Sequence, residues 1–472
     1  MEEFELIAKT FQGLEEVLAK ELVALGANNV QIGRRMVSFS GDKALMYKAN
    51  FHLRTAVRIL KPILHFKASD ADQVYNVIKS IEWEKYLDAN STFSVDSVVY
   101  SDVFRHSKFV AYRVKDAIAD YFNENGYETA YFGKLHLASG KNGGKNIKCE
   151  KTAIPQERLW GYKYFRGADV LEFTSHGYDG YIFDENGNKI DFKGYRADRI
   201  NDFAIEYIEN YNGDKPFFMF ISQLEPHHQN DHNRFEGPKD KIEKYKNYQI
   251  PDDLTNFKGN YKEQYPDYLA AIESLDDNLG RLIKALKEKG IYDNTTIIYT
   301  SDHGCHFKTR NMEYKRSCHD SSIHIPLVIK GKNVEKGVKD NKIISLVDLP
   351  PTILSFADID VPKYYQGTAI QNNSESECAF IQISESQCGR AIRTKDFTYS
   401  VSSPLPLSSS SKLYFEDYLY DNRTDKAQKN NLIKSREYVN IRRDLKKILK
   451  KEINKIEGKE PIILPALIAK SK

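Results

Sequence analysis

The sequence predicts an α/β protein in three parts: an α+β unit over residues 1–122, a three-layer αβα domain over 123–390, and a small antiparallel subdomain over 391–472. Three observations support this. The first part alternates apolar and polar residues, as half-buried strands do. From about Tyr127, short apolar runs are separated by long helical segments, which is typical of buried parallel strands. Shorter alternating runs follow after residue 391.

The first part contains several alternating segments. FELIAKT predicts a strand, and the residues after Gly13 predict a helix with one apolar face that ends near Gly26: Leu14, Val17, Leu18 and Leu22. VQIGRRMVSFSG predicts a pair of strands, and Asp42 is expected to cap a second helix. Further strands are expected at AVRILKPILHF and TFSVDSVVYS, and a helix over Ser107–Asn123.

The second part contains four apolar runs that predict buried strands, namely TAYF, PFFMFIS, TTIIYT and IPLVIK. A long helix is expected over Tyr268–Lys289, because its leucines and isoleucines recur on one face. In the third part, 391–402 and 412–420 predict antiparallel strands, and the lysine-rich segment Arg436–Lys455 predicts a helix with a solvated face.

Composition excludes several classes of protein. The net charge of +3 is too small to indicate nucleic-acid or membrane binding by itself. No run of apolar residues is long enough for a transmembrane helix, and MEEFELIAKTF does not resemble a signal peptide, so we expect a cytoplasmic protein with no membrane partner. Five cysteines without a CxxC pair predict reduced thiols.

Polar side chains follow three of the apolar runs in the second part. They are Lys134 and His136 after TAYF, His227 after PFFMFIS, and Asp302 and His303 after TTIIYT. Because ligands bind beyond the carboxyl ends of strands in α/β sheets, these groups are expected to share one site. Taken one at a time, each is also explained as a solvated turn or a helix cap, and Lys315 as a surface lysine.

Four segments resemble the sulfatases of the alkaline phosphatase superfamily: GYETAYFGKLHLA, LEPHHQN, TSDHGCHFKTRNMEYKRSCHDSS and YLYDNRTDKAQKNNL. The resemblance extends from about residue 122 to the C-terminus. It implies a sulfatase-like α/β fold and a sulfuric ester hydrolase. The implied substrate is a sulfated small molecule or glycan.

The resemblance also implies residue roles. Asp302 and His303 look like two ligands of a divalent cation, normally calcium. Lys134 and Lys315 look like the lysines that bind the sulfate oxygens. His136 looks like the partner of the catalytic nucleophile, and His227 like the histidine that contacts the sulfate near the leaving group. Fixed cations and a proton donor suit the charge that develops on a transferred sulfuryl group.

Part of the family's site is missing from the sequence. The family makes its nucleophile, formylglycine, from a C/S-x-P-x-R motif, and no such motif occurs here. The family also has an Asp pair at the end of its first strand, whereas Asp252–Asp253 and Asp276–Asp277 do not follow apolar strands. We therefore expect a sheet without its first strand, an incompletely ligated calcium site and impaired hydrolysis.

Residues 1–122 resemble the THUMP-containing N-terminus of ribosomal RNA large-subunit methyltransferases, through MEEFELIAKTFQGLEEVLAKELVALGA and VVYSDVFRHSKFVAYRVKDAIADYF. The resemblance implies RNA binding, with phosphate contacts from Arg54, Arg58, Arg105, Lys108 and Arg113; ordinary surface charges are the alternative. No NPPY-like motif or glycine-rich cofactor turn supports methyl transfer. The alternative function is thus an RNA-binding module fused to a passenger sulfatase fragment. Since no flexible linker separates the two parts, a fusion of two truncated genes is the simplest origin.

Overall fold

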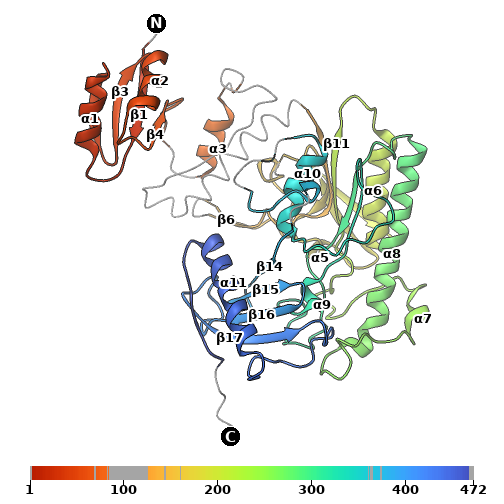
Figure 1. Cartoon of the computed structure of the whole chain (residues 1–472). Helices are drawn as coiled ribbons and strands as arrows, with labels where there is room; N and C mark the ends of the chain where they lie inside the picture. The colour runs from red at the N-terminus through yellow and green to blue at the C-terminus, as the bar shows by residue number, and fades with distance from the viewer. Residues whose placement is uncertain are drawn as a thin grey trace. The chain divides into compact units, whose positions relative to one another are not determined.

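The computed structural model describes residues 3–67, 71–81, 83, 126–142, 145–159, 161–359, 361, 365–372 and 375–466. The chain divides into two compact units, Met1–Val77 and Ile78–Lys472 (Figure 1). The strand expected at TFSVDSVVYS and the helix expected over Ser107–Asn123 lie outside the described residues. The domain boundaries at residues 122 and 390 remain predictions.

The first unit is an antiparallel sheet with two helices. Its strand order is β2-β3-β1-β4, built from β1 (Phe4–Lys9), β2 (Asn28–Gly33), β3 (Met36–Gly41) and β4 (Arg58–Leu60). The helices α1 (Glu15–Ala24) and α2 (Lys43–His52) supply apolar residues to one core with the sheet. The expected cap is confirmed, since the Asp42 carboxylate accepts a hydrogen bond from the Leu45 backbone N–H at 2.8 Å. Only a short part of AVRILKPILHF forms a strand.

The second unit contains a five-stranded sheet of order β10-β9-β8-β5-β11. Its strands are β5 (Glu128–Lys134), β8 (Tyr164–Ala168), β9 (Asp179–Asp184), β10 (Lys189–Lys193) and β11 (Phe217–Ser222). β5 is parallel to both β8 and β11, whereas β9 and β10 run antiparallel to their neighbours. The carboxyl ends of β5, β8 and β11 therefore meet at one edge of the sheet.

Two helices cover one face of this sheet, α6 (Arg196–Asn210) and α8 (Tyr261–Glu288), which lie side by side (Figure 1). Ile200 and Ala204 of α6 pack on Ala130 and Phe132 of β5. Tyr131, on the other side of β5, packs with buried residues of the segment 135–159. The second unit also contains shorter elements: β6 (Gly140–Asn142), β7 (Lys145–Ile147), α5 (Leu171–Thr174), α7 (Ile242–Tyr245), α9 (Asp320–Ile323) and α10 (Leu349–Phe356). The helix α3 (Ala71–Lys79) spans residues of both units.

The remaining two expected strands, β12 (Ile297–Thr300) and β13 (Leu327–Lys330), form a separate antiparallel pair. Within the described residues, the expectation that these runs are buried parallel strands is thus wrong for both: they pair antiparallel, β12 is only half-buried, and Val328 of β13 is 63% exposed. Both β11 and β12 contribute to an apolar cluster with α8. Within the described ranges, however, no strand joins β11 to β12. The loss of the family's first strand stays a prediction, because residues 84–125 lie outside the described residues.

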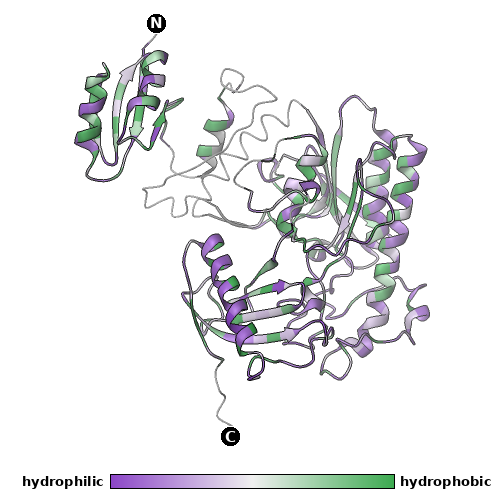
Figure 2. Cartoon of the chain, in the orientation of Figure 1, coloured by the Kyte–Doolittle hydropathy of each residue, from purple (hydrophilic) through white to green (hydrophobic). Residues whose placement is uncertain are grey.

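The C-terminal sheet has the order β14-β15-β16-β17-β18. Its strands are β14 (Cys378–Ile383), β15 (Gly389–Thr394), β16 (Phe397–Ser402), β17 (Leu413–Asp421) and β18 (Ile462–Leu464), and only β18 pairs in parallel. The helix α11 (Val439–Glu457) is mostly hydrophilic (Figure 2), and its buried residues pack on the sheet: Leu445, Leu449 and Ile453. Among the described residues, no helix is long and apolar enough to cross a membrane.

Candidate functional site

The site lies at the carboxyl edge of the sheet β10-β9-β8-β5-β11, where β5 lies very close to β11. Gly133 has a φ of +96°, and a Cβ atom there would lie 2.0 Å from the Ser222 carbonyl oxygen of β11. Only glycine allows this approach and this backbone conformation. Lys134, the last residue of β5, is thereby placed beside the loop that follows β11.

The Lys134 ammonium group is held by a buried carboxylate. Its Nζ lies 2.7 Å from Oε1 of Glu172, and the two side chains are 14% and 4% exposed. Burial alone would raise the pKa of Glu172, but the charge and the hydrogen bond of Lys134 lower it below its ordinary value. The other oxygen, Oε2, has no hydrogen-bond partner among the described residues. Lys134 therefore enters the site as half of an ion pair.

His227 and Lys315 meet next to this pair. The His227 Nδ1 donates a hydrogen bond to the His228 carbonyl oxygen at 2.7 Å, and Nε2 lies 3.5 Å from the Lys315 Nζ. Burial and the charges of Lys315 and Lys134 lower the pKa of His227 to about 4. Burial also lowers the pKa of Lys315. The imidazole is thus neutral near pH 7, with its unprotonated Nε2 toward the Lys315 ammonium.

Asp302 and His303 follow β12 directly. The His303 Nδ1 donates a hydrogen bond to the Gly304 carbonyl oxygen at 2.9 Å, while its Nε2 lies 3.2 Å from Oδ2 of Asp302. Burial lowers the pKa of His303, which favours the neutral ring. A lone pair on Nε2 then faces a carboxylate oxygen, and a cation between them would satisfy both. A carboxylate and an imidazole are suitable ligands for a divalent cation. They supply only two ligands, whereas calcium prefers six to eight.

The charges of Lys134 and Lys315 act on both His227 and His303. Five of the six residues predicted from the sequence are therefore brought together, and the ion pair adds Glu172, which sequence analysis missed. Glu172 follows β8, a strand that was not predicted from the sequence. The apolar residues that precede Glu172 were the signal that could have revealed this strand.

The structure places the other predicted residues differently. The His136 side chain is exposed, and within the described residues it makes no hydrogen bond or ion pair. Its backbone N–H donates to the Asp169 carbonyl oxygen at 2.7 Å. Arg54 and Arg58 are exposed in the first unit. Three predicted RNA contacts lie outside the described residues: Arg105, Lys108 and Arg113.

Comparisons with known proteins find different relatives for two segments of the chain. A family model described as Sulfatase matches residues 89–359, and a model described as the RlmL ferredoxin-like domain matches residues 5–60. An ulvan-active sulfatase from Formosa agariphila is 26% identical over 363 residues, which cover 71% of this chain and 65% of that protein. A ribosomal RNA large subunit methyltransferase K/L from Syntrophotalea carbinolica is 41% identical over 113 residues, which cover 24% of this chain and 16% of that protein.

A solved structure has the same fold in the second unit. The crystal structure of the putative sulfatase yidJ from Bacteroides fragilis aligns with a TM-score of 0.60 and 21% identity, over 71% of this chain and 76% of that one. The fold, the Sulfatase model and the residues gathered at the sheet edge agree. With a family model that covers more than half of its residues, this chain belongs to the sulfatase family.

Proposed function

We propose that this chain binds the sulfate group of a sulfate ester with Lys134, Lys315 and His227, and that it hydrolyses the ester negligibly by itself. The observation that carries the proposal is the convergence of two lysines and a neutral histidine at one sheet edge. Fixed cations in a partly buried site attract an anion more strongly than exposed ones do. The relative from Formosa agariphila is named for ulvan; for this chain we propose the broader class, a sulfated glycan or small molecule.

The negligible hydrolysis follows from the nucleophile. No C/S-x-P-x-R motif is present in the 472 residues. Cys305, Cys318 and Cys378 do not substitute for it, because burial raises the pKa of the first two to about 12 and that of Cys378 to about 11. These thiols stay protonated at neutral pH, and a thiol is a much poorer nucleophile than a thiolate. The predicted role of His136 also depends on a nucleophile, so it stays a prediction.

The cation is part of the same proposal. Asp302 and His303 would hold a divalent ion such as calcium, which would supply positive charge next to the bound sulfate. Further ligands would have to come from elsewhere than this pair, because a hard cation prefers six or more oxygens. Sulfate binding is therefore proposed to depend on the lysines more than on the metal.

Binding of phenyl sulfate, measured by calorimetry with calcium present, tests the proposal. Lys315→Ala is expected to weaken binding about tenfold or more, because a hydrogen bond to a charged group contributes about 1.5–3 kcal/mol. Lys315 suits this test better than Lys134, whose removal would leave the buried Glu172 unpaired.

The matched control is Lys332→Ala, which removes the same charge at an exposed position. Because β13 is antiparallel to β12, Lys332 lies near the start of β12, whereas Asp302 follows the other end of that strand. Its phenyl sulfate affinity should equal that of the unmodified chain. Equal affinity of the Lys315→Ala variant would contradict the proposal.

A second function is favoured by the first unit, whose match to the RlmL ferredoxin-like domain supports an RNA-binding role. We propose that Arg54 and Arg58 contact RNA phosphates. In the full chain, binding to large-subunit ribosomal RNA should weaken with salt. The double variant Arg54→Ala/Arg58→Ala should lower the slope of log K against log salt by about one for each arginine replaced. No binding at low salt, or an unchanged slope, would exclude this role.

A further inference from the structure

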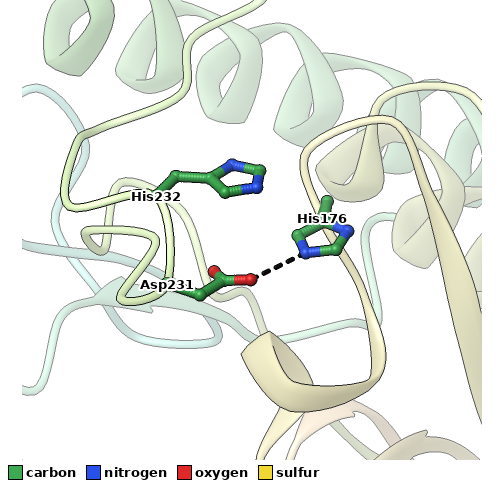
Figure 3. Close-up of side chains that lie close together, drawn as sticks. All are labelled: His176, Asp231 and His232. Atoms are coloured by element: carbon green, nitrogen blue, oxygen red, sulfur yellow. Dashed lines mark hydrogen bonds and ion pairs between the residues drawn. The ribbon is translucent and has the colours of Figure 1, made fainter.

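Three side chains outside the proposed sulfate site gather at the surface of the second unit: His176, Asp231 and His232 (Figure 3). One ligand atom from each lies within 4.8 Å of the others. Within the part of the chain that the structure describes, no other trio of His, Cys, Asp or Glu side chains comes as close. We propose that these three residues bind a zinc-class divalent metal ion.

The geometry leaves one suitable atom of each side chain for a metal. The His176 Nε2 lies 2.8 Å from Oδ2 of Asp231, and the two imidazole rings are stacked with centroids 4.7 Å apart. The His232 Nδ1 is bonded to Oε1 of Glu236 at 2.5 Å, which leaves its Nε2 free to coordinate. A metal about 2.0–2.1 Å from each nitrogen requires the stacked rings to rotate out of their parallel arrangement, because an imidazole binds a metal in its own plane. Both rings are exposed, which leaves room for this rotation.

A second carboxylate supports His232 through a hydrogen bond, and another lies near His176 beyond hydrogen-bond distance. Glu236 binds the Nδ1 of His232, and Oδ1 of Asp179 lies 3.8 Å from the Nδ1 of His176. A carboxylate on the far nitrogen is the usual partner of a metal-bound histidine, because it fixes the ring and raises its basicity. Three carboxylates around two imidazoles also give a negative site, which Arg234, 3.4 Å from Glu236, offsets only in part.

The two loops that carry the ligands are held in place by buried groups. The second loop is closed by a bridge between Gln229 and Arg234, with Asp231 and His232 at its tip. The Arg196 guanidinium, which is 2% exposed, bonds to Ser175 of the first loop and to Gln229 of the second. Asp231 is held as well, since its Oδ1 accepts a hydrogen bond from Nε2 of Gln229 at 2.8 Å. Ligands on restrained loops lose little entropy on binding a metal.

The donor set decides the kind of metal. Two imidazoles and one carboxylate suit zinc and similar transition metals, whereas calcium and magnesium prefer oxygen ligands. The ligands here leave a fourth position for water or another ligand. The site is distinct from Asp302 and His303, but Gln229 also bonds to the Glu172 carbonyl oxygen at 3.2 Å. A metal bound here would therefore stabilise the loop that contacts Glu172, the ion-pair partner of Lys134.

Zinc titration of the metal-free full chain, followed by calorimetry, tests the inference. The unmodified chain should take up one equivalent of zinc at this site, and excess calcium should not displace it. His176→Ala and His232→Ala should each weaken this binding about tenfold or more. Glu236→Gln should weaken it less, by up to about tenfold, because it acts only on the orientation of His232.

Two controls separate this site from others. His52→Ala removes an exposed histidine of the first unit, and Asp302→Ala removes a ligand of the proposed calcium site; both should leave the zinc affinity unchanged. The inference is wrong if the chain takes up no zinc, if both histidine variants bind like the unmodified chain, or if only Asp302→Ala loses binding. Because the three ligands are exposed, the variants are expected to fold, which circular dichroism checks.

Discussion

His227 owes its low pKa to its surroundings, and this determines how the site responds to pH. The ring is buried, two lysine ammonium groups lie close to it, and its Nδ1 proton is already donated to a carbonyl oxygen. Each of the first two effects disfavours the charged ring. A bound sulfate group would bring negative charge and oppose them. The ring should therefore gain a proton more easily when the ester is bound.

This coupling gives a pH prediction. If the pKa of His227 is about 4 in the free chain and higher in the complex, affinity for phenyl sulfate must rise as the pH falls toward the pKa of the complex. The ester itself does not titrate in this range. Calorimetry between about pH 5 and pH 7.5 should show the increase.

The His227→Gln variant is the control for this experiment, because glutamine keeps a polar side chain but does not titrate. Its affinity should change little over the same range. An unchanged affinity in the unmodified chain would show that His227 does not face the bound ester.

At the scale of elements, the contact between β5 and β11 positions the site. Gly133 lets the two strands approach, and the residues that follow each strand then lie at one edge. Gly133→Ala should lower the free energy of unfolding by about 3 kcal/mol, because its positive φ strains an alanine and the new Cβ would meet the Ser222 carbonyl oxygen. Chemical denaturation measures this change.

The control for this substitution is Gly280→Ala in α8. Gly280 is helical, and no neighbouring atom lies within 4 Å of an added Cβ. Alanine there should raise the free energy of unfolding by about 0.5–1 kcal/mol. If Gly133→Ala were as harmless as Gly280→Ala, the close approach of the strands would not hold the site together.

Prediction from the sequence succeeded where the signal was local. The strands β1, β5 and β12 and the cap of α2 agree with their segments, because periodicity and capping depend on near neighbours. The direction of β13 was not predictable, since an apolar run looks the same in parallel and antiparallel pairs. Glu172 was missed because its partner Lys134 is 38 residues away, and only the fold brings them together.

The surface trio was missed for a related reason. His176 lies on one loop and Asp231 and His232 on another, so no spacing in the sequence marks them as ligands. Lys134, His227, Asp302, His303 and Lys315, by contrast, lie in segments that resemble sulfatases, and the fold places them together. Sequence motifs therefore identified most of the proposed site, while the ion pair and the loop contacts required coordinates.

At the scale of the whole molecule, two parts with different relatives are joined in one chain. The first unit matches the RlmL ferredoxin-like domain, and most of the second belongs to the sulfatase fold. Within the described residues, β11 and β12 belong to separate sheets. We therefore expect that the chain keeps the sulfate-binding side of a sulfatase site without its nucleophile.

Turnover of 4-nitrophenyl sulfate by the purified full chain, with calcium present, is the most direct test of this account. The release of nitrophenol should not exceed that of a Lys315→Ala variant, even at ester concentrations that saturate the binding measured by calorimetry. Sustained turnover that Lys315→Ala abolishes would contradict the account, because it would require a nucleophile that the chain is proposed to lack.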